Sequence, residues 1–138
     1  MTNKQLKKYW DIFDMTAIAY GYKCNNHDDL YMGIGSMCYK ADKFAPLIHL
    51  RIEKGYKVGK EVIIPTSMNI LVEDRNGNNI LDGNVCGVYR LEDCDDFENK
   101  FTDMCKYVFD KYVVYSKDNR LDFVFNGYKE ERIKWNNM

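Results

Sequence analysis

The spacing of apolar side chains predicts a helix at the start of the chain. Within residues 2–21, apolar side chains recur every three or four positions, as they do along one face of an α-helix. They are Leu6, Tyr9, Trp10, Phe13, Ala17 and Tyr20. Thr2 and Gln5 have the spacing of a capping box, and Gly21 is a typical helix stop. We therefore expect an amphipathic helix whose apolar face packs on a core.

Residues 23–29 are a polar segment that we expect to be a loop. After it, apolar side chains recur at every second residue, as they do on one face of a β-strand. In residues 30–39 one face carries Leu30, Met32, Ile34 and Cys38, and the other carries Tyr31, Gly33, Gly35 and Tyr39. In residues 46–54 the core positions Ile48, Leu50 and Ile52 alternate with His49, Arg51 and Glu53. A third strand pattern covers residues 61–74, and Pro65 within it marks an edge or a break.

Residues 72–84 look at first like a calcium-binding loop, because acidic and amide side chains alternate there around a glycine. An EF-hand loop counted from Asp74 needs Gly at the sixth position and Glu at the twelfth, but Asn79 and Val85 stand there. Asn76-Gly77 between two apolar stretches is instead a strong signal for a two-residue hairpin turn. We predict a turn that does not bind calcium.

The rest of the chain predicts a strand at residues 85–91, a second helix near residues 95–115 and a C-terminal hairpin. Apolar side chains in the helix recur at three- and four-residue spacing, and the aspartates just before it suit a helix N-terminus. Residues 120–125 alternate in polarity before Asn126-Gly127. Residues 128–135 fit either the second strand of a hairpin or a short helix.

These elements predict an α+β fold in a single domain, residues 1–138. We expect a twisted antiparallel sheet of about five to six strands with both amphipathic helices on one face. The connections look too short for crossovers between parallel strands.

Composition limits the class of protein. The formal net charge of −1 lacks the excess of Lys and Arg that a dedicated nucleic-acid-binding protein needs. No apolar stretch is long enough to cross a bilayer, and the N-terminus does not look like a secretory signal, so we expect a cytoplasmic protein. Five irregularly spaced cysteines favour reduced thiols over a disulfide framework. The abundance of Lys, Asn and Tyr is compatible with a phage or mobile element of an AT-rich host.

No pattern in the sequence indicates a catalytic or metal site. Gly33 and Gly35 lack the third glycine of a dinucleotide-binding loop. Cys94 lies among acidic residues that oppose a reactive thiolate. Cys24 and His27 are one close pair, whereas a structural zinc site needs four ligands. We expect no metal and no other cofactor, and an enzyme only if the fold assembles a site from distant residues.

Two surfaces are candidate binding sites. The first is a ligand surface on the glycine-bearing strand and its neighbour, with Tyr31, Gly33, Gly35, Tyr39, His49, Arg51 and Glu53. The second is an acidic cluster that faces only Lys100 in the same stretch and consists of Glu92, Asp93, Asp95, Asp96, Glu98 and Asp103. The cluster would suit a protein partner with a basic surface, and a solvated helix end is its alternative explanation.

We therefore expect a binding protein that acts through a protein partner, as an inhibitor of a host defence nuclease in the manner of anti-CRISPR proteins. The first alternative is a module that binds or sequesters a small ligand such as a nucleotide. The second is an enzyme whose site only the fold assembles.

Overall fold

The structure, a computed structural model, describes residues 1–41, 45–73, 85–113 and 131–138. These residues form two long helices and eight strands. In chain order the elements are α1 (Asn3–Ala19), β1 (Lys23–Asp29), β2 (Gly33–Tyr39), β3 (Leu47–Glu53), β4 (Tyr56–Val58), β5 (Glu61–Ile64), β6 (Ser67–Glu73), β7 (Val85–Glu92), α2 (Phe97–Val113) and β8 (Glu131–Lys134), followed by a 3₁₀ turn at Trp135–Asn137.

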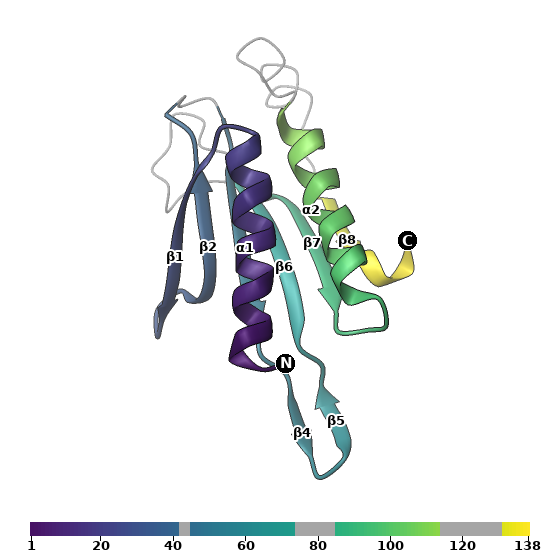
Figure 1. The fold of residues 1–138 in the computed structure, drawn as a ribbon. Coiled ribbons are helices and arrows are strands. Elements are labelled where there is room, and N and C mark those ends of the chain that lie inside the picture. Colours follow the sequence, from purple (N-terminus) through teal and green to yellow (C-terminus); the bar gives the residue numbers. More distant parts are fainter. Residues whose placement is uncertain (42–44, 74–84, 114–130) are drawn as a thin grey trace.

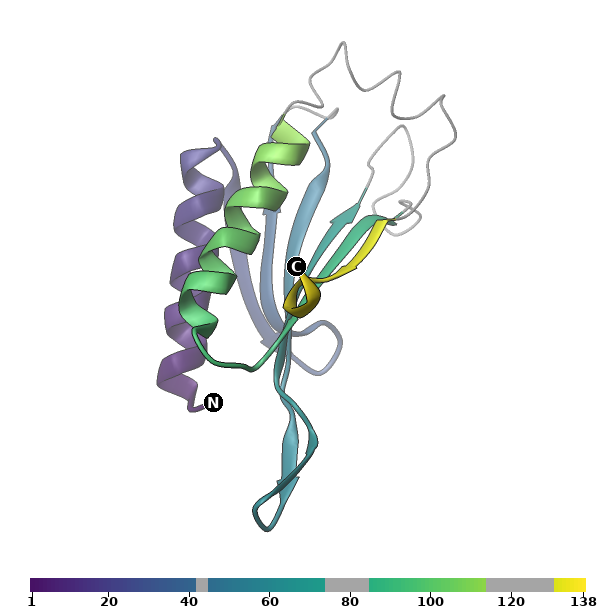
Figure 2. The same cartoon turned by 90° about the vertical axis from the view of Figure 1, so that its right-hand side faces the viewer.

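Six of the strands form one sheet in the order β1-β2-β3-β6-β7-β8 (Figure 1). Neighbouring strands are antiparallel except β7 and β8, which are parallel. Both helices pack on the same face of this sheet (Figure 2). The predicted α+β fold, with two helices on one face of a six-stranded sheet, is confirmed.

The core lies between the helices and the sheet. Side chains alternate between the two faces of a strand, so every second residue of β3, β6 and β7 reaches this core. The buried residues of these strands on that side include Ile48, Leu50, Ile52, Met68, Ile70, Val72, Tyr89 and Leu91. We call the opposite side of the sheet the open face, because no helix of the described residues covers it (Figure 2).

Helix α1 begins as the sequence predicts. Thr2 and Gln5 form a capping box in which each side chain accepts a hydrogen bond from the other residue's backbone N–H. Leu6, Phe13 and Ala17 are among its buried residues, so the apolar face does pack on the core. Neither of the two described helices combines the length and the apolar character needed to cross a lipid bilayer.

The polar segment at residues 23–29 is a strand, so the predicted loop is wrong. This segment is β1, and each of its seven residues pairs with one in β2, from Lys23 opposite Tyr39 to Asp29 opposite Gly33. An edge strand takes its backbone hydrogen bonds from one neighbour whatever its side chains are. A strand can therefore form without an alternation of apolar and polar residues. The next strand, β2, which was predicted over residues 30–39, begins only at Gly33. Residues 30–32 before it belong to the turn between β1 and β2.

The expectation that all connections are too short for a parallel crossover is also wrong. Helix α2 follows β7, and β8 then pairs with β7 in parallel, with Gly87 opposite Glu131. A parallel pair needs a crossover connection, and α2 supplies it. Residues 131–134 are therefore a strand of the main sheet, and not a helix. The segment at residues 120–127 that was predicted to begin a hairpin lies outside the described residues.

Strands β4 and β5 form a separate antiparallel hairpin, which we call the arm. It projects beyond the main sheet between β3 and β6 (Figures 1 and 2). Pro65 stands between β5 and β6, and it breaks the pattern that the sequence predicted over residues 61–74. The predicted Asn76-Gly77 turn and the rejected calcium loop lie outside the described residues, although β6 and β7 on either side of them pair antiparallel.

Candidate ligand site on the open face

The register of the sheet aligns one residue from each strand in a row across the open face. This row consists of His27, Gly35, Arg51, Asn69, Arg90 and Lys134. A parallel row two residues along consists of Asn25, Met37, His49, Leu71, Val88 and Arg132. Residues that are distant in the sequence thus become neighbours on this face.

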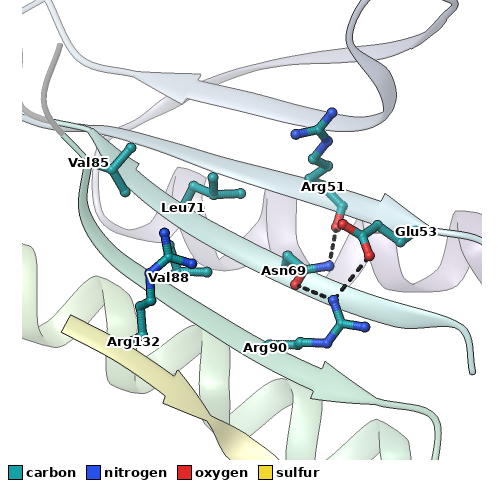
Figure 3. Close-up of a pocket in the computed structure, with 8 residues that line it drawn as sticks. All are labelled: Arg51, Glu53, Asn69, Leu71, Val85, Val88, Arg90 and Arg132. Carbon is teal, nitrogen blue, oxygen red and sulfur yellow. Dashed lines mark hydrogen bonds and ion pairs between the residues drawn. The ribbon is translucent and has the colours of Figure 1, made fainter. Parts of the chain in front are cut away.

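Part of the two rows encloses a hollow of about 280 Å³, which we call the arginine hollow. Its lining residues are Arg51, Glu53, Asn69, Leu71, Val85, Val88, Arg90 and Arg132 (Figure 3). Three of the five arginines of the whole chain line it, although Lys is three times as abundant as Arg. Glu53 is the only carboxylate among these lining residues, against three arginines.

Arg90 is fixed by its neighbours. Its Nη1 lies 3.0 Å from Oε2 of Glu53, and its Nε lies 3.6 Å from Oε1 of Glu92. Asn69 accepts a hydrogen bond from Arg90 at 3.4 Å and donates one to the carbonyl oxygen of Arg51, also at 3.4 Å. Asn69 is nearly buried beneath these contacts. Glu53 therefore orients Arg90 and partly offsets its charge.

Arg51 differs from Arg90. Its guanidinium makes no hydrogen bond or ion pair with any other residue in the described ranges, and Figure 3 shows it turned away from the pair of Arg90 and Glu53. The side chain of Arg132 extends toward Val88, which lines the apolar floor together with Leu71 and Val85 (Figure 3). The hollow thus combines an apolar floor with guanidinium groups at its sides.

Two histidines form a pair beside the hollow. Nε2 of His27 lies 2.8 Å from Nε2 of His49, and Nδ1 of His27 lies 2.9 Å from the carbonyl oxygen of Gly33. Because a carbonyl only accepts, Nδ1 of His27 donates to it. In neutral His27 the Nε2 atom is then an acceptor, and Nε2–H of His49 donates to it. Burial, the charge of His27 and the charge of Arg51 lower the pKa of His49 to about 4.

Gly35 is required by close packing. A Cβ atom at this position would lie 1.9 Å from the carbonyl oxygen of Leu50 and 3.1 Å from Cε1 of His27. The ring of His27 therefore occupies the space above Gly35, where the sequence suggested a bare surface for a flat ligand.

The structure brings together only some of the predicted ligand-surface residues. Gly35, His49, Arg51 and Glu53 lie in adjacent positions of β2 and β3. Tyr31 is 88% exposed in the turn before β2, and Tyr39 lies at the other end of that strand. Gly33 is the first residue of β2 and has a positive φ of 77°. Tyr31 and Tyr39 are therefore too far apart to hold one small ligand between their rings.

Comparison with known proteins adds no further candidate. No protein-family model, no curated protein and no solved structure matches the chain.

The acidic cluster lies in the connection from β7 to α2 and on α2 itself. Glu92 makes ion pairs with Lys134 at 3.2 Å and with Arg90 at 3.6 Å. Glu98 makes an ion pair with Lys8 of α1 at 2.8 Å. The exposed members of the cluster are Asp93, Asp95, Asp96, Glu98 and Asp103. Asp96 accepts a hydrogen bond from the amide of Asn99 at 2.8 Å. Three of the six carboxylates therefore have partners within the fold, which gives them a structural explanation.

Cys24 and His27, the close pair that was rejected above as a zinc site, point to opposite faces of β1. They are three residues apart, and an odd separation on a strand places side chains on opposite sides. Cys24 contacts Asp14 on the helix side, whereas His27 contacts His49 on the open face. These two residues cannot bind one metal ion together.

Sequence reasoning missed Arg90, Arg132, Asn69 and His27. Arg90 and Asn69 lie in predicted strands, but which residues of other strands they would meet depends on the register. His27 lay in a segment predicted to be a loop. The available signal was the scarcity of arginine: the chain has only five, and Arg51 and Arg90 both stand in predicted strands at positions that alternate with core positions.

Proposed function

We propose that the protein binds a small anionic ligand, of the nucleotide class, in the arginine hollow. The observation that supports this most directly is that three of the five arginines line one hollow on an uncovered sheet face. This corresponds to the first alternative that the sequence left open, a module that binds or sequesters a small ligand.

The chemistry of the hollow suits such a ligand. A guanidinium is planar, stays charged at every physiological pH and can donate two parallel hydrogen bonds to a phosphate or a carboxylate. The apolar floor of Leu71, Val85 and Val88 would contact a flat ring. A volume of about 280 Å³ lies near the lower end of the range for small-molecule sites. A mononucleotide is therefore a better fit than a polymer.

Titration calorimetry with adenosine and guanosine mono- and triphosphates, and with inorganic phosphate, tests this proposal. Arg51→Ala should weaken binding about 10- to 100-fold, because a hydrogen bond to a charged group contributes about 1.5–3 kcal/mol. Arg51→Lys keeps the charge but loses the two-pronged geometry, so it should recover only part of the affinity.

Lys7→Ala is the matched control, because it removes one positive charge from the exposed surface of α1. It should leave the affinity unchanged. If none of these anions binds, or if Arg51→Ala and Lys7→Ala bind equally well, the hollow is not a ligand site.

A second candidate function, binding of a protein partner, is supported by the arm. Five large apolar side chains of the arm are between 43% and 62% exposed. They are Tyr56, Val58, Val62, Ile63 and Ile64. A two-stranded hairpin alone is only marginally stable in water, so an arm that exposes apolar side chains gains stability when a partner covers it.

This second candidate keeps the expectation of a cytoplasmic protein that inhibits a host defence nuclease. Affinity capture from host lysate should compare the wild type with a Val58→Ser and Val62→Ser double variant. Met15→Ser is the control, because Met15 is 71% exposed on α1, away from the arm. A partner that the double variant loses and Met15→Ser retains supports docking on the arm, and identical captured sets exclude it.

The same capture tests the acidic cluster. A variant with Asp95, Asp96 and Glu98 changed to Ser should retain its fold and should bind more slowly to a partner with a basic surface. Association kinetics that match the wild type at low and at high salt would leave the cluster as solvated surface.

A further inference from the structure

Two cysteines that are 14 residues apart in the sequence meet between α1 and the sheet. Cys24 of β1 and Cys38 of β2 are directly opposite in the register of the two strands. Their Sγ atoms are 2.9 Å apart. Cys38 is fully buried and Cys24 is half-buried, so the pair is reached from the side of β1.

Helix α1 adds a carboxylate to this pair. Helix α1 packs against β1 and β2 (Figure 1). Asp14 in its last turns places its carboxylate next to the two thiols, and one donor atom from each of the three residues lies within 4.8 Å of the others. Asp14 is half-buried.

The carboxylate of Asp14 is held in place by two further side chains. Ser36 donates a hydrogen bond to Oδ1 of Asp14 at 2.6 Å, and Asn26 donates one to Oδ2 at 2.7 Å. Asn26 also donates to the hydroxyl of Ser36 at 2.9 Å. Residues that orient a metal-binding carboxylate in this way are a usual part of metal sites.

We propose that Asp14, Cys24 and Cys38 form a binding site for a single zinc ion, or for a metal ion of similar preference. Two thiolates with one carboxylate form a donor set that suits zinc and cobalt, whereas calcium and magnesium prefer oxygen donors alone. Three protein ligands leave a fourth position, which water can fill.

Binding of the metal requires both thiols to lose a proton. Two S–H bonds break, two bonds from sulfur to the metal form, and two protons pass to the buffer. A hydrogen bond to Cys24, burial, and the nearby charges of Cys24 and Asp14 raise the pKa of Cys38, so the thiol stays protonated until a cation compensates that negative charge. Tetrahedral zinc would move the two sulfurs to about 3.8 Å apart, which small side-chain rotations provide.

A disulfide is the main alternative for this pair. It would form by exchange with an oxidant such as glutathione disulfide, and that exchange needs a thiolate as the attacking group. The carboxylate of Asp14 opposes thiolate formation on either route, but only metal binding adds a positive charge that this carboxylate binds directly. The presence of Asp14 therefore favours the metal over the disulfide.

Titration of the reduced, chelator-treated protein with Co²⁺ tests the site, because cobalt bound by thiolates absorbs in the near ultraviolet. We expect saturation at one Co²⁺ per chain and displacement by Zn²⁺. Cys24→Ser and Cys38→Ser should each lose most of the absorption, and Cys94→Ser, a half-buried cysteine outside the site, should keep it. No absorption in the folded wild type, or equal absorption in Cys24→Ser, overturns the proposal.

Two further variants test the carboxylate. Asp14→Asn should keep the thiolate absorption but weaken the affinity, because the amide carries no charge. Ser36→Ala removes the hydroxyl that orients Asp14 and should weaken Co²⁺ binding about 10- to 100-fold. Affinity equal to that of the wild type in both variants removes Asp14 from the site and overturns the proposal as stated.

The wild type alone provides an independent measurement if the cysteine variants do not fold. Zn²⁺ should raise the melting temperature, and a chelator should reverse the rise. Zn²⁺ should also protect Cys24 and Cys38 from oxidation by glutathione disulfide, as followed by mass spectrometry. An unchanged melting temperature, or a disulfide between them that forms equally fast with and without Zn²⁺, overturns the proposal.

Discussion

The pair of His27 and His49 predicts that the fold loses stability when the pH falls from 7 to 5. His49 is only 8% exposed, and its Nε2–H donates to Nε2 of His27. Burial is the largest cause that lowers its pKa to about 4, and the charges of His27 and Arg51 add to it. In the unfolded chain the same side chain has a pKa near 6.5.

The sign of the effect follows from these two pKa values. Above pH 6.5 His49 is neutral in both states, so it causes no loss of stability. Between pH 6.5 and pH 4 the unfolded chain takes up a proton that the folded chain does not, and stability falls with pH. The loss amounts to about 2 kcal/mol at pH 5 and approaches about 3 kcal/mol at pH 4.

Denaturant unfolding at pH 8, 7, 6 and 5 measures this loss, with His49→Gln as the reference. The amide of Gln can donate to Nε2 of His27 but does not titrate. Carboxylates that titrate over the same range do so in both proteins, and their contribution cancels in the difference. Between pH 7 and pH 5 the wild type should lose about 2 kcal/mol more than His49→Gln. Parallel stability curves would refute the assignment of a buried neutral His49.

Three further predictions concern positions elsewhere in the fold. Gly35→Ala should lower the free energy of unfolding by about 1–3 kcal/mol or prevent folding, because its Cβ would overlap the backbone of Leu50; a variant that melts with the wild type would contradict the close packing. Thr2→Ala should cost about 0.5–2 kcal/mol in denaturant unfolding through loss of the capping box, and an unchanged midpoint would mean that the start of α1 is frayed in solution. Millimolar calcium should leave the melting temperature unchanged, because Val85 stands where a calcium loop needs a carboxylate; a rise that a chelator reverses would refute this.

The parts of the fold that the sequence predicted are those in which one face is buried and the other is not. Helix α1 has this property, and in the second half of strand β3 the exposed Arg51 and Glu53 alternate with the buried Leu50 and Ile52. The arm and β8 have no buried face of this kind. All residues of β4 and β5 are exposed, and the partner of β8 is set by the course of the chain around α2. No local pattern encodes such a pairing.

The candidate ligand site was predictable only in part. The alternation along β3 placed His49, Arg51 and Glu53 on one face, and the structure agrees. Their contacts with Asn69 and Arg90 depend on the register between β3, β6 and β7, which a single sequence does not provide. A shift of one residue in the pairing of β3 with β6, or of β6 with β7, would turn the side chains of Asn69 or Arg90 away from the open face, and the hollow would not form.

Strand β1 was missed because both of its faces are polar, and the structure shows what makes this possible. Five of its seven residues are exposed and the other two, Cys24 and His27, are half-buried, so most of its polar side chains stay in contact with water. On the inner face Asn26 donates to Asp14 of α1, and on the open face His27 bonds to His49 of β3. Each of these partners comes from a different element, so no alternation along β1 could reveal them. A polar stretch between strand patterns is therefore compatible with a strand whenever other elements can supply such partners. The histidine pair and the two facing thiols both depend on β1 being that strand.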